Sequence, residues 1–201
     1  MLLLIVLWIA WCVLHSLLIT TAVRQWFEGK GGAWLGLYRL GYVGFSLATL
    51  APLLWYSQML PQRQLAALPL WAQALQVLLF VYALALFVGG ARVYDLHSFL
   101  GLAQWRAYQT GRTPGPPAFR QTGILHHVRH PWYGGGIALL WAMPDLTQVS
   151  LAIRTILTAY LILGALLEER KLKAEFGQTY QDYCRRTPML FPWKFHPWAR
   201  T

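Results

Sequence analysis

Acidic residues are scarce in this chain, with 7 Asp and Glu among 201 residues against 17 Lys and Arg. Charged residues make up 12% of the sequence, whereas soluble domains carry about twice that fraction. By contrast, 57% of the residues are hydrophobic. Because so few charged side chains cannot cover a water-exposed surface, the composition excludes an ordinary soluble domain and predicts an integral membrane protein.

Cysteine is also rare, and the sequence has neither strand-like alternation nor an internal repeat. Cys12 and Cys184 lie at opposite ends of the chain, in no spacing typical of metal ligands. We interpret them as two unrelated thiols and expect no metal site. The missing inverted repeat argues against a small transporter, and the missing alternation favours an all-α protein.

Long apolar runs predict a polytopic α-helical membrane bundle of about five membrane segments. They cover residues 2–22, 34–57, 70–91, 131–145 and 149–167. The first run is long enough to span a bilayer. Since it has no basic leader and no cleavage site, we expect a retained transmembrane helix rather than a signal peptide. The fourth run is too short for an upright span, so it predicts a helical hairpin with the fifth, entering from the cytoplasm.

The basic residues give the chain a net charge of +10 and gather on one side of the predicted membrane segments. This distribution follows the positive-inside rule and predicts a cytoplasmic C-terminus, with outer loops near Arg63 and Asp145. Only Arg63 and Arg154 fall on the outer side. Such charge orients a membrane protein and binds anionic headgroups, so we expect a membrane-embedded protein with no nucleic-acid partner.

The predicted segments divide the chain into two regions of one folding unit. Residues 1–92 form an N-terminal scaffold of three spans. Residues 93–201 contain a cytoplasmic connection, the helical hairpin and a C-terminal polar helix with a predicted break at Gly177. The connection has a Gly- and Pro-rich centre that cannot form a continuous helix, and it predicts a loop with a short interfacial helix.

The stretch RHPWYGG, residues 129–135, places charged and polar groups at the start of an apolar segment. Pro131 is suited to the first position of a helix. Arg129 and His130 would then lie at a helix N-terminus, where backbone N–H groups favour a carboxylate or phosphate. Tyr133 follows in the first turn. A cap combined with a membrane anchor explains the same residues equally well.

A pair of acidic residues, Glu168 and Glu169, ends the last apolar segment. Acidic charge is unfavourable at a helix C-terminus, although a solvated helix face explains one of the two. Tyr180 and Tyr183 share one helix face with Phe176. Aromatic rings beside carboxylates suit a zwitterionic ligand that carries a positive centre.

Two stretches, GILHHVRHPWYGG (residues 123–135) and LEERKLKAEFGQTYQDYCRRTPMLFP (residues 167–192), resemble the isoprenylcysteine carboxyl methyltransferase family. The shared pattern is R-H-P-x-Y-x-G, E-E-x-x-L, F-G-x-x-Y-x-x-Y and a proline-flanked tail, in that order. The N-terminal half, with LHSLL and YRLGY, is more similar to bacterial methanethiol S-methyltransferases and NnrU-type membrane proteins. We therefore expect a protein of the bacterial inner membrane.

The resemblance implies an integral-membrane methyltransferase that uses S-adenosylmethionine in a cytoplasm-facing pocket formed by the C-terminal half. It also implies that the acceptor reaches the methyl group from the bilayer. The implied cofactor-binding residues are Gln104, Thr122, Gly123, Ile124, Leu125, Arg129, His130, Pro131, Tyr133, Glu169, Tyr180 and Tyr183. The implied catalytic residues are Arg129 and Glu168.

Methyl transfer is an in-line displacement that needs orientation more than a strong base. Arg129 can orient either an anionic acceptor or the cofactor carboxylate, and Glu168 can position the acceptor or accept a proton. The sequence leaves these assignments open. His15, in the first segment, either faces a cavity or, as we favour, is a buried histidine bonded to a neighbouring helix.

Three readings of the function remain at this point. The first is methylation of a lipophilic, membrane-partitioning acceptor, such as an isoprenylcysteine-type carboxylate or a lipid. The second is S-methylation of a small thiol such as methanethiol. The third is an NnrU-like membrane binding protein without catalysis, against which the intact E-E and Y-x-x-Y elements argue.

The charge asymmetry makes the topology testable by cysteine-accessibility labelling. We expect single cysteines at Arg112 and Phe195 to react only from the cytoplasmic side, because these positions lie among the basic residues. Labelling of either position from outside would overturn the predicted orientation.

Overall fold

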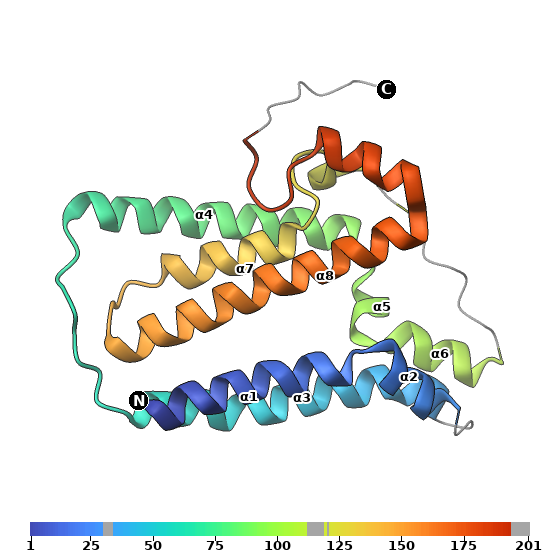
Figure 1. The fold of residues 1–201 in the computed structure, drawn as a ribbon, viewed down its shortest axis with the longest axis horizontal. Coiled ribbons are helices and arrows are strands. Elements are labelled where there is room, and N and C mark those ends of the chain that lie inside the picture. The colour runs from blue at the N-terminus through green and yellow to red at the C-terminus, as the bar shows by residue number, and fades with distance from the viewer. Residues whose placement is uncertain (30–33, 112–118, 120, 194–201) are drawn as a thin grey trace. The chain divides into compact units, whose positions relative to one another are not determined.

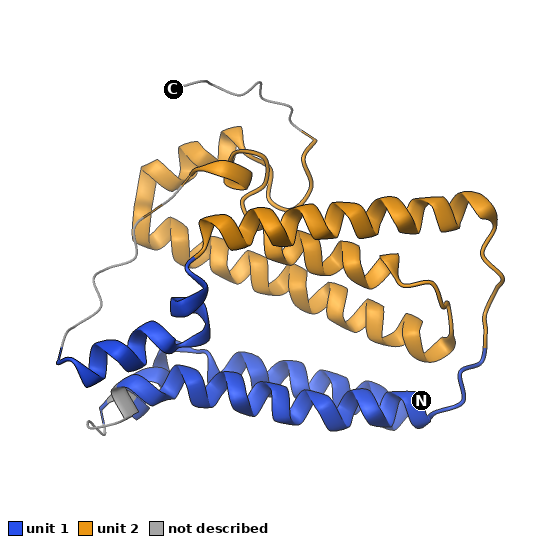
Figure 2. Cartoon of the chain, turned by 180° about the vertical axis from the view of Figure 1, so that it is seen from behind, with its two compact units in different colours: residues 1–63, 95–117 blue, residues 64–94, 118–201 orange. Residues whose placement is uncertain are grey.

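The computed structural model describes residues 1–29, 34–111, 119 and 121–193. Within these ranges the chain forms two compact units (Figure 2). One unit contains residues 1–63 and 95–117, and the other contains residues 64–94 and 118–201. Every regular element longer than an isolated bridge in the described part is a helix, so the prediction of an all-α membrane bundle is confirmed.

The first unit is built on two long helices, α1 (Leu2–Leu18) and α3 (Trp34–Met59), with α2 (Thr21–Glu28), α5 (Leu96–Leu100) and α6 (Leu102–Gln109) (Figure 1). Hydrogen bonds between side chains run along the seam between α1 and α3. Trp8 Nε1 donates to Ser57 Oγ at 3.1 Å, and Trp11 Nε1 donates to Thr49 Oγ1 at 3.1 Å. Such hydrogen bonds fix the register of one apolar helix against another.

His15 belongs to the same seam. Its Nδ1 lies 3.0 Å from Ser46 Oγ and its Nε2 lies 2.6 Å from Tyr42 Oη, both on α3. The ring also stacks on Trp11, with centroids 4.9 Å apart. The favoured interpretation of His15 is confirmed in its bonds to a neighbouring helix, but the side chain is half-buried and not buried as expected.

The second unit contains α4 (Leu70–Val93), the 3₁₀ turn η1 (Gly123–His126), α7 (Pro131–Ala142) and α8 (Gln148–Arg186). In Figure 1, α4, α7 and α8 run side by side. Helix α7 packs closely on α4 at Gly90, where an added Cβ would collide with the Trp132 ring. The missing side chain at Gly90 thus makes room for the Trp132 ring of α7. Small residues are common at such contacts between membrane helices.

The turn between α7 and α8 is fastened from within. The buried Arg154 donates from Nη2 to Met143 O at 3.1 Å and to Asp145 O at 2.6 Å. Thr147 caps α8 in a capping box with Ser150. The segment before α4 joins the same end, because Leu65 N donates to Leu146 O at 2.9 Å. The two loops predicted to lie on the outer side therefore meet.

Within the described part of the chain, α3, α4 and α8 are long and apolar enough to cross a membrane. Helices α1 and α2 together form a fourth candidate, bent by 58°. Helix α7 has 12 residues and a length of about 18 Å, so it is too short to cross alone, as its sequence predicted. The predicted hairpin with α8 is confirmed. Arg112 and Phe195, the labelling positions, lie outside the described residues.

The third apolar segment, predicted to belong with the N-terminal scaffold, forms α4 and packs on α7 within the second unit. Its sequence is apolar on all sides, so periodicity did not indicate which neighbour it would choose. The boundary predicted at residue 92 stays a prediction.

Helix α8 is interrupted at Gly177, where φ is +54° and ψ is −129°. L-residues with a Cβ rarely adopt this conformation. The predicted break is therefore confirmed. The turn after Gly177 brings Tyr180 and Tyr183 back against the segment 125–130, where Tyr183 Oη donates to Leu125 O at 2.5 Å.

We expect Gly177→Ala to destabilise the protein by about 1–3 kcal/mol, the usual cost of a strained backbone conformation. An added Cβ would meet no atom within 4 Å, so the cost is conformational and not steric. Gly44→Ala, in the regular part of α3, is the matched control and should stabilise by about 0.5–1 kcal/mol. Equal thermal unfolding midpoints for Gly177→Ala and the parent protein would contradict the role of the break.

Candidate active site

The carboxylate of Glu169 is the centre of a buried polar cluster in the second unit. Its Oε1 lies 2.7 Å from Arg129 Nε, 2.9 Å from His130 Nε2 and 2.8 Å from Tyr180 Oη. Its Oε2 lies 3.4 Å from Cys184 Sγ and 3.7 Å from Lys173 Nζ. The Glu169 residue is 5% exposed. One carboxylate therefore joins the start of α7 to both arms of α8.

Arg129 is held on its other side by backbone oxygens. Its Nη1 donates to Cys184 O at 3.2 Å and also to Thr187 O. Burial lowers the pKa of the guanidinium, but the hydrogen bond and the negative charge of Glu169 outweigh burial and raise that pKa overall. Arg129 is thus a permanent cation whose charge is balanced by Glu169.

The contacts of Glu169 fix the state of the His130 ring. Arg129 Nε can only donate, so Oε1 is an acceptor, and His130 Nε2 must carry the hydrogen that faces it. In the neutral ring, Nδ1 then carries the lone pair. Nδ1 lies 3.9 Å from Glu168 Oε2, beyond hydrogen-bond distance. His130 is 3% exposed, whereas the Glu168 side chain is 44% exposed.

Aromatic rings cover the cluster on one side. The Phe119 ring centroid lies 5.0 Å from Phe176, 5.6 Å from Tyr180 and 5.5 Å from Tyr183. The pairs with the tyrosines are edge-to-face, the arrangement that ring quadrupoles favour. The predicted aromatic face of α8 is therefore in place, and Phe119 packs against it.

The segment after α8 completes the cluster. Arg129 N donates to Pro188 O at 3.0 Å, and His130 N donates to Met189 O at 3.0 Å. Tyr82 on α4 donates from Oη to Leu190 O at 3.2 Å. These bonds satisfy backbone groups that precede α7 and hold the segment 187–190 against it.

The structure brings most of the predicted site residues together in the second unit. Leu125, His130, Pro131, Glu169, Tyr180 and Tyr183 form the buried part, whereas Thr122, Gly123 and Glu168 are exposed, and Ile124, Arg129 and Tyr133 are half-buried. Pro131 begins α7, as predicted. Gln104 lies in the other compact unit, where its Nε2 donates to Ser98 O at 3.1 Å, and its predicted contact with a cofactor stays a prediction.

One premise about the acidic pair was wrong. Glu168 and Glu169 were placed at a helix C-terminus, but α8 continues through them to Arg186. The apolar run ends at the acidic pair, but the helix continues. The two glutamates are therefore far from the negative end of the helix dipole, and the dipole does not disfavour them. Sequence reasoning also missed Phe119, Cys184 and Thr187. A proline next to Thr187 marked the end of α8, but no pattern indicated its contact with Arg129.

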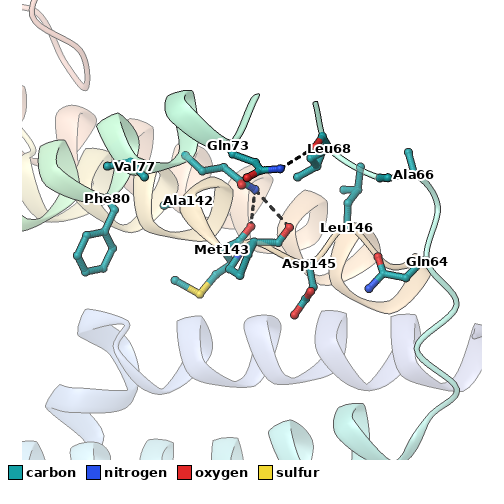
Figure 3. Close-up of a pocket in the computed structure, with 13 residues that line it drawn as sticks. Gln64, Ala66, Leu68, Gln73, Val77, Phe80, Ala142, Met143, Asp145 and Leu146 are labelled. Carbon is teal, nitrogen blue, oxygen red and sulfur yellow. Dashed lines mark hydrogen bonds between the residues drawn. The ribbon is translucent and has the colours of Figure 1, made fainter. Parts of the chain in front are cut away.

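A cavity in the second unit lies away from this cluster. Its volume is about 600 Å³, and it is lined by residues 64 and 66–68, the first turns of α4 and the α7–α8 turn (Figure 3). Gln76 closes one wall by donating to Met143 O at 2.7 Å. None of the predicted site residues lines this cavity, which lies at the end of α7 opposite to His130.

The cluster predicts different consequences for the two glutamates. Glu169→Gln leaves the buried Arg129 charge without its partner and should destabilise the protein by about 3–5 kcal/mol. Glu168→Gln changes an exposed side chain and should alter stability by less than about 0.5 kcal/mol. Thermal unfolding in detergent measures both. A stable Glu169→Gln protein would show that Glu169 is not the partner of Arg129.

Comparison with known proteins places the chain in a family. The family model described as NnrU protein matches residues 3–195. Methanethiol S-methyltransferase 2 of Bradyrhizobium diazoefficiens is 32% identical over 183 residues, which cover 89% of this chain and 68% of that protein. Methanethiol S-methyltransferase 1 of the same organism is 38% identical over 94 residues, 47% of this chain and 33% of that protein.

A more distant relative is Nurim of Sus scrofa, 26% identical over 167 residues, which cover 79% of this chain and 63% of that protein. The chain thus spans about two thirds of the length of two of these relatives and a third of the other. No solved structure matches it. The chain belongs to the NnrU family, and its relatives confirm the prediction of an integral-membrane methyltransferase.

Proposed function

We propose that the chain transfers a methyl group from S-adenosylmethionine to a small thiol such as methanethiol. The observation that carries this proposal is the similarity to a methanethiol S-methyltransferase over 89% of the chain. An isoprenylcysteine-type carboxylate or a lipid acceptor stays a prediction, because the relatives are named for a thiol. We also propose a cytoplasm-facing site in the bacterial inner membrane, in line with the positive-inside charge pattern.

The residues around the cluster fit S-adenosylmethionine by their chemistry. The cofactor has a sulfonium cation, a carboxylate and an adenine ring. Glu168 offers an exposed carboxylate for the cation, and the half-buried rings of Phe119 and Phe176 offer π faces for the cation or the adenine. Among the described residues, nothing accepts a hydrogen bond from Arg129 Nη2, which therefore suits the cofactor carboxylate.

When bound, the cofactor supplies an electrophilic methyl group. We assign direct contacts to the accessible predicted residues and to Arg129 Nη2. The accessible residues are Thr122, Gly123, Ile124 and Tyr133. The buried predicted residues pack behind these and hold them in place, because side chains that are fully covered by protein cannot touch the cofactor. They are Leu125, His130, Pro131, Glu169, Tyr180 and Tyr183.

A thiol acceptor gives the catalytic residues their task. A thiol is largely protonated at neutral pH, whereas the thiolate is the nucleophile. The exposed Glu168 carboxylate is therefore proposed to receive the proton, and Arg129 to orient the cofactor rather than the acceptor. An isoprenylcysteine carboxylate is already ionised and would need no proton acceptor. Glu168 would therefore be required for a thiol acceptor but not for a carboxylate acceptor.

The direct test is methyl transfer by purified protein in lipid nanodiscs, with S-adenosylmethionine labelled in the methyl group. We expect labelled dimethyl sulfide from methanethiol and no label on a prenylcysteine analogue. Calorimetry with S-adenosylhomocysteine is run beside it. Binding without transfer to either acceptor would favour another acceptor, and absence of binding would favour an NnrU-like protein without catalysis.

Tyr133→Phe tests the cofactor wall without removing the ring. If the Tyr133 hydroxyl contacts the cofactor, its loss should weaken S-adenosylhomocysteine binding by about 1–3 kcal/mol, or roughly 5- to 150-fold in Kd. Tyr108→Phe, an exposed tyrosine of α6, is the matched control and should bind normally. Unchanged affinity in Tyr133→Phe would move the cofactor contact elsewhere.

A further inference from the structure

Two proton acceptors face each other at the edge of the cluster. His130 Nε2 carries the hydrogen bonded to Glu169 Oε1 at 2.9 Å, so the lone pair of the neutral ring is on Nδ1. The nearby group on that side is Glu168 Oε2 at 3.9 Å. A lone pair beside a carboxylate oxygen is an unfavourable pair that a single proton between them would stabilise.

Exposure divides this pair into an outer and an inner member. The Glu168 side chain is 44% exposed, and the His130 side chain is 3% exposed. A proton therefore reaches Glu168 first and His130 second. Glu169 is a poorer inner member, because its Oε1 already accepts from Arg129, His130 and Tyr180. Its Oε2 accepts from Cys184 Sγ and lies 3.7 Å from Lys173 Nζ.

We propose that Glu168 and His130 form a two-step proton relay that removes the proton of the acceptor thiol, an inference that rests on the proposed function. The S–H bond breaks, its electron pair stays on the thiol sulfur, and the proton passes to Glu168 Oε2 and then to His130 Nδ1. The sulfur pair forms the new S–CH₃ bond, while the pair of the broken donor bond returns to the donor sulfur. The proton leaves through Glu168 to solvent after transfer.

The histidine is needed because a carboxylate alone is a poor base for a thiol. In free peptides the pKa of a carboxyl is roughly 4 units below that of a thiol, and the pKa of an imidazole is roughly 2 units below it. Holding the proton on the imidazole is thus less unfavourable. Glu169 acts as a positioning residue, since it fixes the tautomer that leaves Nδ1 open.

Other ionisable groups lie around the pair, and one of them, Tyr94, could in principle compete for the thiol proton. Glu169 and Lys173 lie on α8, Arg129 precedes α7, and Tyr133 packs edge-to-face on His130 with centroids 5.6 Å apart. Tyr94, just after α4, faces Glu168, and burial, helped by the Glu168 charge, raises the pKa of its hydroxyl. Tyr94 therefore stays protonated and does not compete for the thiol proton.

The test compares acceptors of different acidity in single-turnover transfer with S-adenosylmethionine. For an alkyl thiol, Glu168→Gln should slow transfer by about 10²–10⁴-fold, the usual contribution of a general base. For an aromatic thiol that is already ionised, the same variant should slow transfer by less than about 10-fold, because no base is needed. Glu175→Gln, exposed on the same helix, should slow neither.

The outcomes separate this relay from the proposed function. If the parent protein methylates no thiol, the proposed function fails. If it methylates both thiols and Glu168→Gln slows both equally, the relay alone is overturned. A measurement without turnover adds a second check: ¹⁵N NMR of labelled histidine should show a hydrogen on Nε2 of His130 and none on Nδ1. A ring with its hydrogen on Nδ1 would also overturn the relay.

Discussion

The second unit depends on one carboxylate oxygen, Glu169 Oε1, which accepts hydrogen bonds from Arg129, His130 and Tyr180. These three donors come from the start of α7 and from the part of α8 beyond its break. Without the break at Gly177, Tyr180 would continue away from Glu169 along a straight helix. The backbone conformation of Gly177 and the charge of Glu169 are therefore both needed to form the same hydrogen-bonded cluster.

This constraint divides the work between neighbouring glutamates. Glu169 is buried and fully occupied by protein groups, so its charge serves to hold Arg129 and to orient His130. Glu168, one residue earlier on the helix, points to a more exposed side and keeps its carboxylate accessible. Successive residues on a helix face directions about 100° apart, which lets one acidic pair supply both a structural anchor and a group for chemistry.

Much of this could be predicted from sequence, for physical reasons that differ by element. Hydropathy located the long helices and the short α7, and the glycine and proline rules located the break at Gly177 and the start at Pro131. Hydropathy could not show that α4 packs on α7, because an all-round apolar helix has no preferred face. The bonds from Arg129 and His130 to Pro188 and Met189 are main-chain contacts, which leave no side-chain pattern. The open lone pair of His130 follows only from geometry.

The central claim is that Glu169 joins the two arms of α8 to α7 through shared hydrogen bonds. A double-mutant cycle on Glu169→Gln and Tyr180→Phe tests it most directly, with the free energy of unfolding measured in a denaturing detergent. If Tyr180 donates to the Glu169 carboxylate, the two changes are not additive, and the coupling energy should be about 0.5–3 kcal/mol. Additive effects, with a coupling energy near zero, would contradict the account.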